Sequence, residues 1–352
     1  MIESVQKTDN SRKLTIVEAT REGIREEMMR DDRVFIIGED VGISPGGIGG
    51  SFAIFLGLSD EFGHDRVIDT PISEKAIIGA CVGAAMMGLR PIAEFQYSDF
   101  AFCAMDELIN EAPKMRYMSG GKLKVPMVVR APVGSYKRGA QHSQTPDTYF
   151  CHTPGWKIAV PSNAYDAKGI IKTAVRDDNP VFIFEHKLLY GSKGPLKREV
   201  PGGIDLTCYV PEEEYLIPFG KAVIRREGTD VTIVATQLVL YWAMSAAERI
   251  EREEGISCEI IDPVTLVPLD IETILKSVSK TNRVIIAHED TLSFGWGAEV
   301  AALIADEGFS YLDAPIKRVC SSDVPMPFSP IMEKYVLPNE ERLYKEIKNL
   351  AT

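Results

Sequence analysis

The stretch Asp69-Thr70-Pro71-Ile72-Ser73-Glu74 leads into a segment, residues 76–89, that contains no charged side chain. Thr is a good N-cap, and Pro is well tolerated at the first helical position, so the pattern predicts a helix that starts at Thr70-Pro71. The uncharged segment is too short to span a membrane and too apolar for a surface helix. We therefore expect it to be enclosed in protein, with Gly79 and Gly83 allowing close approach of another backbone.

Glu74 lies at the mouth of this apolar helix and has two interpretations. A carboxylate in the first turn is favourable, because the helix N-terminus prefers negative charge by roughly 0.3–1 kcal/mol. Alternatively, the carboxylate is held in a low-dielectric site, where desolvation raises its pKa and suits it to proton transfer. Taken alone, the segment favours the first interpretation.

The composition is that of a globular protein long enough for two domains: 352 residues, 45% hydrophobic and 26% charged. The net charge of −12 argues against non-specific binding to nucleic acid and to an anionic membrane surface. The six cysteines form no C-x-x-C pair and predict neither a disulfide framework nor a zinc site. The N-terminus lacks a signal or transit pattern, and we expect a cytoplasmic protein.

Apolar β-branched runs alternate with helical patterns along the whole chain, which predicts α/β domains built on parallel sheets. The predicted strands are 34–38, 91–95, 127–130, 158–160, 181–184, 231–235, 259–261, 284–287 and 316–319, and the predicted helices of the first half are 15–30, 101–118 and 165–176. A charged region rich in Gly and Pro interrupts the alternation. We therefore predict a first domain over residues 1–190, a linker over 191–217 and a second domain over 218–352.

The glycine-rich stretch 42–50 matches neither the P-loop nor the dinucleotide fingerprint, and a surface loop is the better interpretation. Three other patches are candidates for chemistry. Residues 94–100 follow a predicted strand, where α/β proteins bind ligands, although core aromatics would give the same pattern. His142 lies in a polar loop and is either an acid–base group or an exposed histidine. Residues 176–180 form either a turn or a set of oxygen ligands for a hard cation.

Together these patches resemble one family, the beta subunit of the thiamine-diphosphate-dependent decarboxylase component of 2-oxo acid dehydrogenase complexes. The segments that carry the resemblance occur in family order and span nearly the whole chain. They are Gly38-Glu39-Asp40-Val41-Gly42, Asp69-Thr70-Pro71-Ile72-Ser73-Glu74, Gly88-Leu89-Arg90-Pro91, Tyr117-Met118-Ser119-Gly120-Gly121, His142-Ser143-Gln144, Asp166-Ala167-Lys168-Gly169 and Pro268-Leu269-Asp270. The acetoin dehydrogenase branch is similar through residues 312–318 and 327–330.

The resemblance implies a transketolase-like fold, with a pyrimidine-binding domain and a transketolase C-terminal domain. It implies that Glu74 hydrogen-bonds the aminopyrimidine of thiamine diphosphate and so promotes formation of the nucleophilic ylide. Phe100 and Gln96 are implied to contact the cofactor, and His142 to assist proton transfer or to guide the lipoyl group. A potassium site is implied at the carbonyls of Met127, Ala174, Val175 and Asp177, with Asn179.

The chain contains no Gly-Asp-Gly, the family motif that holds Mg²⁺ and diphosphate. The resemblance therefore implies half an active site, completed by an alpha subunit that holds Mg²⁺, in a heterotetramer of two alpha and two beta chains. The implied reaction is oxidative decarboxylation of a 2-oxo acid and acyl transfer to a lipoyl-bearing acyltransferase. Two positions depart from the family pattern: Val264 replaces an arginine, and Gln237 replaces a glycine.

Alternative functions stay open at this point. The chain resembles an acetoin dehydrogenase beta subunit as well, and pyruvate and branched-chain substrates are not distinguished by the sequence. One part of a split transketolase is a further alternative, for which Lys137 and Arg138 are the only obvious phosphate-binding candidates. A domain pair that serves only in assembly is the non-enzymatic alternative, and the presence of Glu74, Phe100 and His142 together argues against it.

Overall fold

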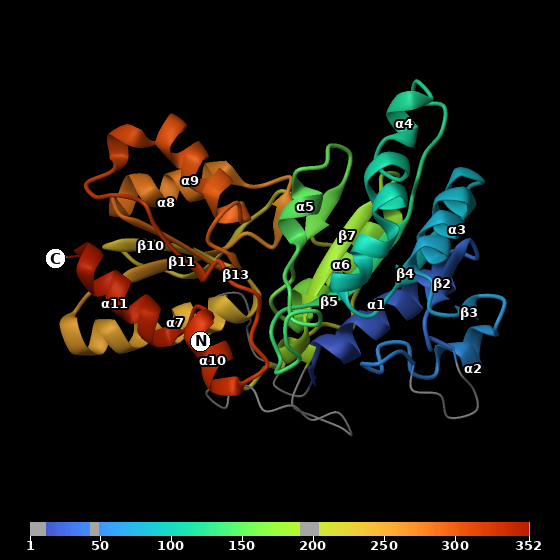
Figure 1. The fold of residues 1–352 in the computed structure, drawn as a ribbon, viewed down its shortest axis with the longest axis horizontal. Coiled ribbons are helices and arrows are strands. Elements are labelled where there is room, and N and C mark those ends of the chain that lie inside the picture. The colour runs from blue at the N-terminus through green and yellow to red at the C-terminus, as the bar shows by residue number, and fades with distance from the viewer. Residues whose placement is uncertain (1–11, 43–48, 191–203, 352) are drawn as a thin grey trace. The chain divides into compact units, whose positions relative to one another are not determined.

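The computed structural model describes residues 12–42, 49–190 and 204–351 (Figure 1). The chain forms two compact units, which are described separately. The N-terminal unit contains the described residues of Asp9–Val133 and Tyr149–Phe219, and the C-terminal unit contains those of Gly134–Thr148 and Gly220–Thr352. The segment that carries His142 thus belongs to the C-terminal unit, although it precedes much of the N-terminal unit in sequence. Part of the predicted linker, residues 191–203, lies outside the described residues.

The N-terminal unit contains a parallel sheet with the strand order β6-β7-β5-β4-β2-β3. In chain order its strands are β2 (Val34–Gly38), β3 (Val67–Asp69), β4 (Arg90–Glu94), β5 (Val128–Val133), β6 (Lys157–Ala159) and β7 (Val181–His186). Most of their residues are buried, as expected for a parallel sheet covered on both faces. A short antiparallel pair, β1 (Lys13–Leu14) with β8 (Cys208–Tyr209), adds to this unit. The predicted alternation of strands and helices is confirmed.

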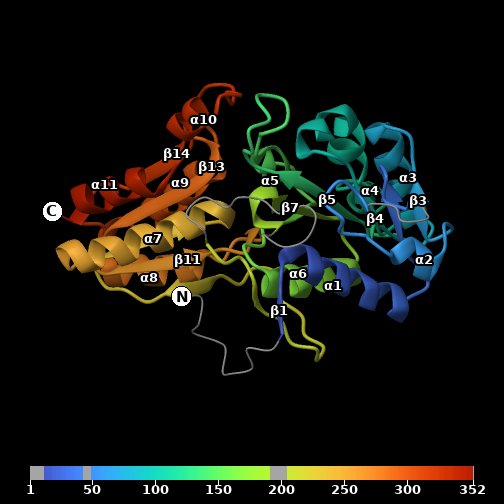
Figure 2. The same cartoon turned by 90° about the horizontal axis from the view of Figure 1, so that it is seen from below.

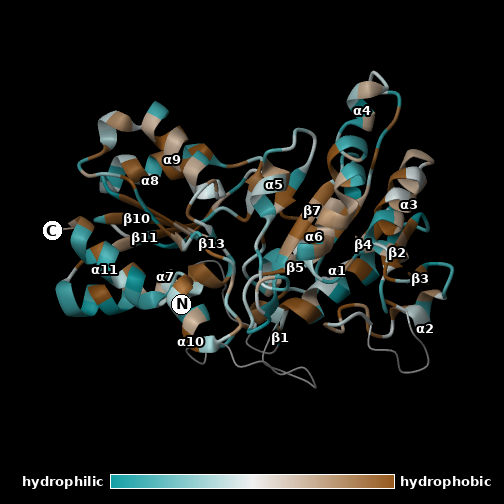
Figure 3. Cartoon of the chain, in the orientation of Figure 1, coloured by the Kyte–Doolittle hydropathy of each residue, from teal (hydrophilic) through white to brown (hydrophobic). Residues whose placement is uncertain are grey.

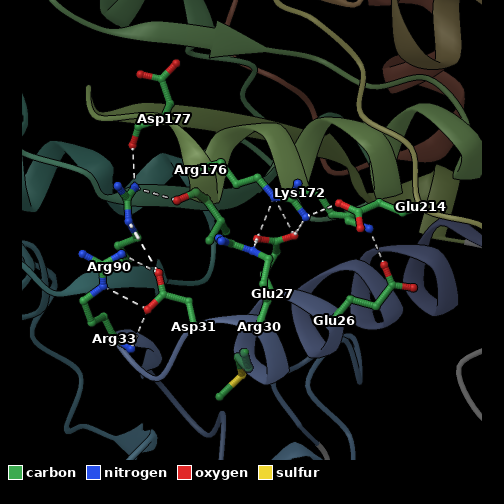
Figure 4. Close-up of polar contacts among 12 residues, drawn as sticks. Glu26, Glu27, Arg30, Asp31, Arg33, Arg90, Lys172, Arg176, Asp177 and Glu214 are labelled. Atoms are coloured by element: carbon green, nitrogen blue, oxygen red, sulfur yellow. Dashed lines mark hydrogen bonds and ion pairs between the residues drawn. The ribbon is translucent and has the colours of Figure 1, made fainter.

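Helices cover both faces of this sheet: α1 and α6 lie together on one side, and α3 and α4 lie on the other (Figure 2). The helices of this unit are α1 (Ile16–Arg30), α2 (Leu58–Phe62), α3 (Glu74–Met86), α4 (Met115–Met118) and α6 (Ala164–Arg176). Thr15 caps α1 in a capping box with Glu18. Ion pairs join α1 to α6, among them Lys172 with Glu26 at 2.5 Å and Arg176 with Glu27 at 2.6 Å (Figure 4).

The single helix predicted over residues 101–118 is wrong. The structure has a 3₁₀ segment at Ser98–Ala104, a wide turn of π type at Glu107–Glu111 and the short helix α4. Pro113 lies between the last two, and it contributes to the break because it has no N–H to donate to a preceding carbonyl.

The helix start predicted at Thr70-Pro71 is also wrong, since α3 starts at Glu74 and has Ser73 at its N-cap. The Thr70 N–H instead donates to the Gly38 carbonyl at 2.9 Å, which extends the pairing of β3 with β2. The helix is not enclosed by this chain alone. Ile77, Ile78 and Cys81 lie on the buried side of α3, whereas Met87, just beyond the end of the helix, is 85% exposed.

The C-terminal unit has a five-stranded sheet of order β14-β13-β10-β11-β9, parallel except for the edge strand β9. The strands of this sheet are β9 (Val223–Arg226), β10 (Val231–Ala235), β11 (Cys258–Asp262), β13 (Val284–Thr291) and β14 (Lys317–Ser321). The unit also contains the short strand β12 (Thr265–Val267), which is not part of this sheet, and the helices α7 (Gln237–Glu254), α8 (Ile271–Thr281), α9 (Trp296–Glu307), α10 (Pro330–Val336) and α11 (Glu340–Ala351). The short helix α5 (Asp147–Cys151) starts at the end of the segment Gly134–Thr148, which carries His142.

Three layers form this unit: α8 and α9 on one face of the sheet and α7 and α11 on the other (Figure 1). The hydrophobic core includes Ile233, Val239 and Leu343, from the sheet and the α7–α11 layer. The central strands are accordingly mostly hydrophobic, whereas the outer surfaces of α7 and α11 are hydrophilic (Figure 3).

Other expectations have mixed outcomes. The predicted surface loop at residues 42–50 falls largely on residues 43–48, which lie outside the described residues, but its flanks Gly42, Gly49 and Gly50 are buried. All six cysteines are free thiols. Among the described residues, no helix has the length and apolar character needed to cross a membrane.

Candidate active site

Glu39 and Glu74 lie at the carboxyl ends of adjacent strands. Glu39 follows β2 directly, and Gly38 at the end of β2 is in register with Asp69 at the end of β3. The connection from β3 then runs through residues 70–73 to Glu74, the first residue of α3. Because parallel strands end at the same edge of the sheet, two carboxyl groups far apart in sequence are brought to one place.

The two carboxyl groups interact electrostatically. Burial, and next the charge of Glu74, raise the pKa of Glu39 to about 7. Glu74 itself is only 8% exposed. The Glu39 Oε1 atom is buried and has no hydrogen-bond partner in the part of the chain that the structure describes. A carboxyl group whose pKa lies near 7, with a second carboxyl group close to it, is suited to proton transfer at neutral pH. Sequence reasoning missed Glu39, although its place directly after a buried strand was a usable signal.

The strand β4 lies next to β2, with Glu94 in register with Gly38, so residues 94–100 leave the sheet at the same edge. Gln96 Nε2 and Glu94 Oε1 are both buried and have no hydrogen-bond partner within residues 12–42, 49–190 and 204–351. Both atoms lie beside Gly50, where an added Cβ would come within 2.9 Å of Glu94 Oε1 and 3.7 Å of Gln96 Nε2. Phe100 is half-buried in the 3₁₀ segment that follows.

Arg130 of β5 is fully buried behind these groups. Its guanidinium pairs with Glu94 on one side and Glu185 of β7 on the other, and it lies 5.4 Å from the ring centroid of Phe55. Buried carboxylates of this kind need a paired cation, because isolated burial of a charge is very costly. Arg130 thus fixes the Glu94 side chain. Neither Arg130 nor Glu185 was predicted from the sequence, since both lie inside an apolar strand pattern.

His142 belongs to the C-terminal unit, in the segment Gly134–Thr148. Its backbone N–H donates to the Gly139 carbonyl at 3.4 Å, and its side chain is half-exposed. The base of the segment is closed by the Gly134 N–H, which donates to the Gln144 carbonyl at 3.0 Å. His142 and Glu74 belong to different units, and the role of His142 toward Glu74 stays a prediction.

The five residues of the predicted cation site lie around the C-terminal end of α6 and the starts of β5 and β7. Protein donors already contact them. Arg90 donates to the carbonyls of Val175 and Asp177 at 2.9 Å each (Figure 4). The carbonyls of Met127 and Ala174 accept from Val181 and Asp177 backbone N–H groups, and Asn179 Oδ1 accepts from Arg116 at 2.6 Å.

A guanidinium therefore supplies positive charge to two of the four predicted carbonyls. The cation site stays a prediction. Among the described residues, no group of three or more His, Cys, Asp and Glu side chains could hold a metal ion.

The sequence matches the family "Transketolase, pyrimidine binding domain" over residues 12–193 and "Transketolase, C-terminal domain" over residues 220–343. Among solved structures, a split gene transketolase in an inactive beta4 tetramer aligns with a TM-score of 0.73 at 22% identity, covering 96% of this chain and 98% of that one. Transketolase from Leishmania mexicana aligns with a TM-score of 0.69 at 14% identity, covering 99% of this chain and 47% of that one. The protein is thus a two-domain, transketolase-like chain.

Similarity in sequence defines the family more narrowly. The chain is 44% identical over 340 residues to the 2-oxoisovalerate dehydrogenase subunit beta of Bacillus subtilis, covering 96% of this chain and 98% of the relative. It is 43% identical over 339 residues to the pyruvate dehydrogenase E1 component subunit beta of Rickettsia felis, with the same coverage. It is 42% identical over 345 residues to the beta subunit of acetoin:2,6-dichlorophenolindophenol oxidoreductase of Bacillus subtilis, covering 95% of this chain and 96% of the relative. The chain belongs to the family of E1 beta subunits of 2-oxo acid and acetoin dehydrogenases.

Proposed function

We propose that this chain, with an alpha subunit, catalyses oxidative decarboxylation of a 2-oxo acid and passes the acyl group to a lipoyl-bearing acyltransferase. The observation that carries the proposal is the carboxyl pair Glu39–Glu74 at the sheet edge, in a chain that belongs to the E1 beta-subunit family. The activity depends on the alpha subunit, because the chain lacks the Gly-Asp-Gly motif for Mg²⁺ and diphosphate. The assembly is a heterotetramer of two alpha and two beta chains.

Thiamine diphosphate fits the groups at the sheet edge. Its aminopyrimidine offers ring nitrogens and an exocyclic amine, and the chain offers buried polar atoms of Glu39, Gln96 and Glu94 that lack partners among the described residues. Any other residue at Gly50 would crowd this group, because an added Cβ would lie 2.9 Å from Glu94 Oε1. When bound, the cofactor supplies the nucleophilic carbon and takes up the electrons released by decarboxylation. Mg²⁺ would be held mainly by the alpha subunit.

The residues of this chain would control protons and position. Glu74 would hold a proton at a pyrimidine ring nitrogen, and its low exposure would keep water from competing for that contact. Glu39, with its pKa near 7, would limit the negative charge that accumulates beside Glu74. Phe100 would form a flat apolar wall against the ring. His142 would donate or accept a proton on the substrate side or guide the lipoyl group.

The exposed side of α3 supports contact with another subunit. Ala76 and Ala80 are exposed there, and a Cβ built on Gly83 meets nothing within 4 Å. Ile72 just before the helix is 82% exposed and Met87 just after it is 85% exposed. Small residues flanked by large apolar ones would let a second helix approach closely and bury apolar surface.

Co-expression with the candidate alpha chain tests the function. The assembled protein should be assayed with pyruvate, branched-chain 2-oxo acids, acetoin and sugar phosphates, using a dye as the electron acceptor. Turnover of a 2-oxo acid that requires both chains and thiamine diphosphate is the expected result. Turnover of acetoin alone would assign the acetoin branch, and turnover of sugar phosphates alone would refute the proposal.

A potassium ion at the end of α6 is part of the same proposal. Replacing K⁺ by Na⁺ and then by choline should lower the melting temperature of the assembled enzyme if the carbonyls of Val175 and Asp177 bind the ion. Equal melting temperatures in the three salts would show that Arg90 alone serves these carbonyls.

A further inference from the structure

The segment Gly134–Thr148, called here the His142 segment, is bound at both limbs by carboxylates of the C-terminal unit. Two of the three come from consecutive residues at the end of β13, Glu289 and Asp290, and the third is Glu333 of α10. Consecutive residues of a strand point in opposite directions, so one strand end can reach two limbs of a loop.

The incoming limb is held through its backbone. Ser135 is 1% exposed, so its N–H needs a partner inside the protein, and it donates to Glu289. The Lys137 N–H donates to Glu333 Oε2 at 2.8 Å. Lys137 has φ +54°, a left-handed conformation that is uncommon for a residue other than glycine and needs support from its surroundings. Glu333 is only 8% exposed, which shields this hydrogen bond from water.

The outgoing limb is held through a side chain. Thr148 Oγ1 donates to Asp290 Oδ2 at 2.8 Å. Asp147, which precedes it, is 2% exposed, and burial first and then the charge of Asp290 raise the pKa of its carboxyl group. A further contact comes from Phe328, in the chain before α10. A Cβ built on Gly139 would lie 3.4 Å from the Phe328 ring, an ordinary van der Waals distance.

We propose that Glu289, Asp290 and Glu333 are positioning residues that hold the His142 segment in the conformation required for the reaction. This inference rests on the proposed function, because it assumes that His142 takes part. None of the three carboxylates needs to touch substrate. They act through the backbone N–H groups of Ser135 and Lys137 and through the hydroxyl of Thr148, and so fix the ends between which His142 lies.

Trypsin offers a test that does not depend on activity, because Lys137 and Arg138 are exposed cleavage sites inside the segment. In the full-length chain, Glu333→Ala should speed the first cut at these sites by about tenfold, since it removes an acceptor from a backbone donor. Glu333→Gln keeps a carbonyl oxygen for the Lys137 N–H and should be cut at nearly the wild-type rate. Glu341→Ala is the matched control, because Glu341 pairs with Arg249 at 2.9 Å on α11, away from the segment.

Kinetics of the assembled enzyme complete the test. Glu333→Ala should lower kcat by about tenfold with little change in KM for the 2-oxo acid, and Glu333→Gln should restore most of it. Asp290→Asn, which keeps an acceptor for Thr148, and Asp290→Ala give a second pair if Glu333→Ala does not fold. Unchanged trypsin cleavage in both alanine variants, or equal acceleration in the alanine and amide variants, would overturn the inference. So would wild-type kcat in a variant whose segment is cut faster.

The two proposals fail separately. An inactive wild-type assembly with the expected trypsin pattern would refute the proposed function and leave the carboxylate contacts established. An active wild-type assembly with trypsin rates that do not respond to the substitutions would do the reverse.

Discussion

Glu39 and Glu74 lie 35 positions apart in the sequence, yet their carboxyl groups interact: burial first, and then the charge of Glu74, raise the pKa of Glu39 to about 7. The pair exists because β2 and β3 are parallel neighbours that end at the same edge of the sheet. Its chemistry gives the first two predictions.

Glu74→Gln should lower kcat of the assembled enzyme by at least about 10²-fold, the lower end of the range for loss of a positioned acid–base group. The amide has nearly the same shape but cannot exchange a proton at neutral pH. Steady-state assay with the preferred 2-oxo acid measures the effect, with Glu61→Gln on α2 as the control. Turnover near the wild-type level would exclude Glu74 as the acid–base group.

Glu39→Gln should stabilise the isolated chain at pH 8 and have little effect near pH 4.5. The folded-state pKa, about 7, lies above the ordinary value of 4.5, so the folded chain favours protonated Glu39 and loses stability as the pH rises through that interval. The amide imitates the protonated form. Because Glu39 is only half-buried, we expect a gain of about 1 kcal/mol at pH 8. Urea unfolding at both pH values measures it, and a gain that does not depend on pH would contradict the assignment.

Arg130→Met should lower the free energy of unfolding by about 3–5 kcal/mol, because it leaves two buried carboxylates without their cation. Arg130 pairs with both Glu94 and Glu185 and is fully buried. The triple variant with Glu94→Gln and Glu185→Gln should recover part of the loss, since it removes the uncompensated charge. Denaturant unfolding of the three proteins, wild type included, checks this. No recovery in the triple variant would mean that packing rather than charge explains the loss.

Gln237→Gly should be more stable than Gln237→Ala by about 1 kcal/mol, because Gln237 has φ +52°, where glycine pays no steric cost. The comparison with alanine separates the backbone effect from loss of the buried side chain. Thermal unfolding of the two variants provides the measurement, and equal stabilities would show that the backbone relaxes at this position.

The sequence predicted the architecture well where one local rule sufficed. Thr15 at the start of α1 and the β-branched run of β2 are local signals, and the structure agrees with both. Thr70 carried an equally good local signal for a helix cap, but it continues the pairing of β3 with Gly38, and the helix starts only at Glu74. Local capping rules cannot register such competition from a neighbouring strand.

Residues of the candidate site were predictable to the extent that they follow strands or match the family pattern. Glu74, Gln96 and Phe100 were predicted in this way. Arg130 was not, because a charged residue inside a buried strand can be interpreted only when its partners are known, and Glu94 and Glu185 come from two other strands. The unusual backbone at Gln237 was visible only as a departure from the glycine usual in the family.

The ion pairs between α1 and α6 have a consequence for how these helices find their alignment. Lys168 contacts both Glu22 and Glu26, one turn apart, at 2.5 and 2.7 Å, so a slip of one helix by a turn would still pair opposite charges. Close packing at Gly23 distinguishes between these alignments, because a Cβ added there would lie only 2.8 Å from Ile171 Cγ2. Charges hold the two helices together, and a missing methyl group sets their axial register.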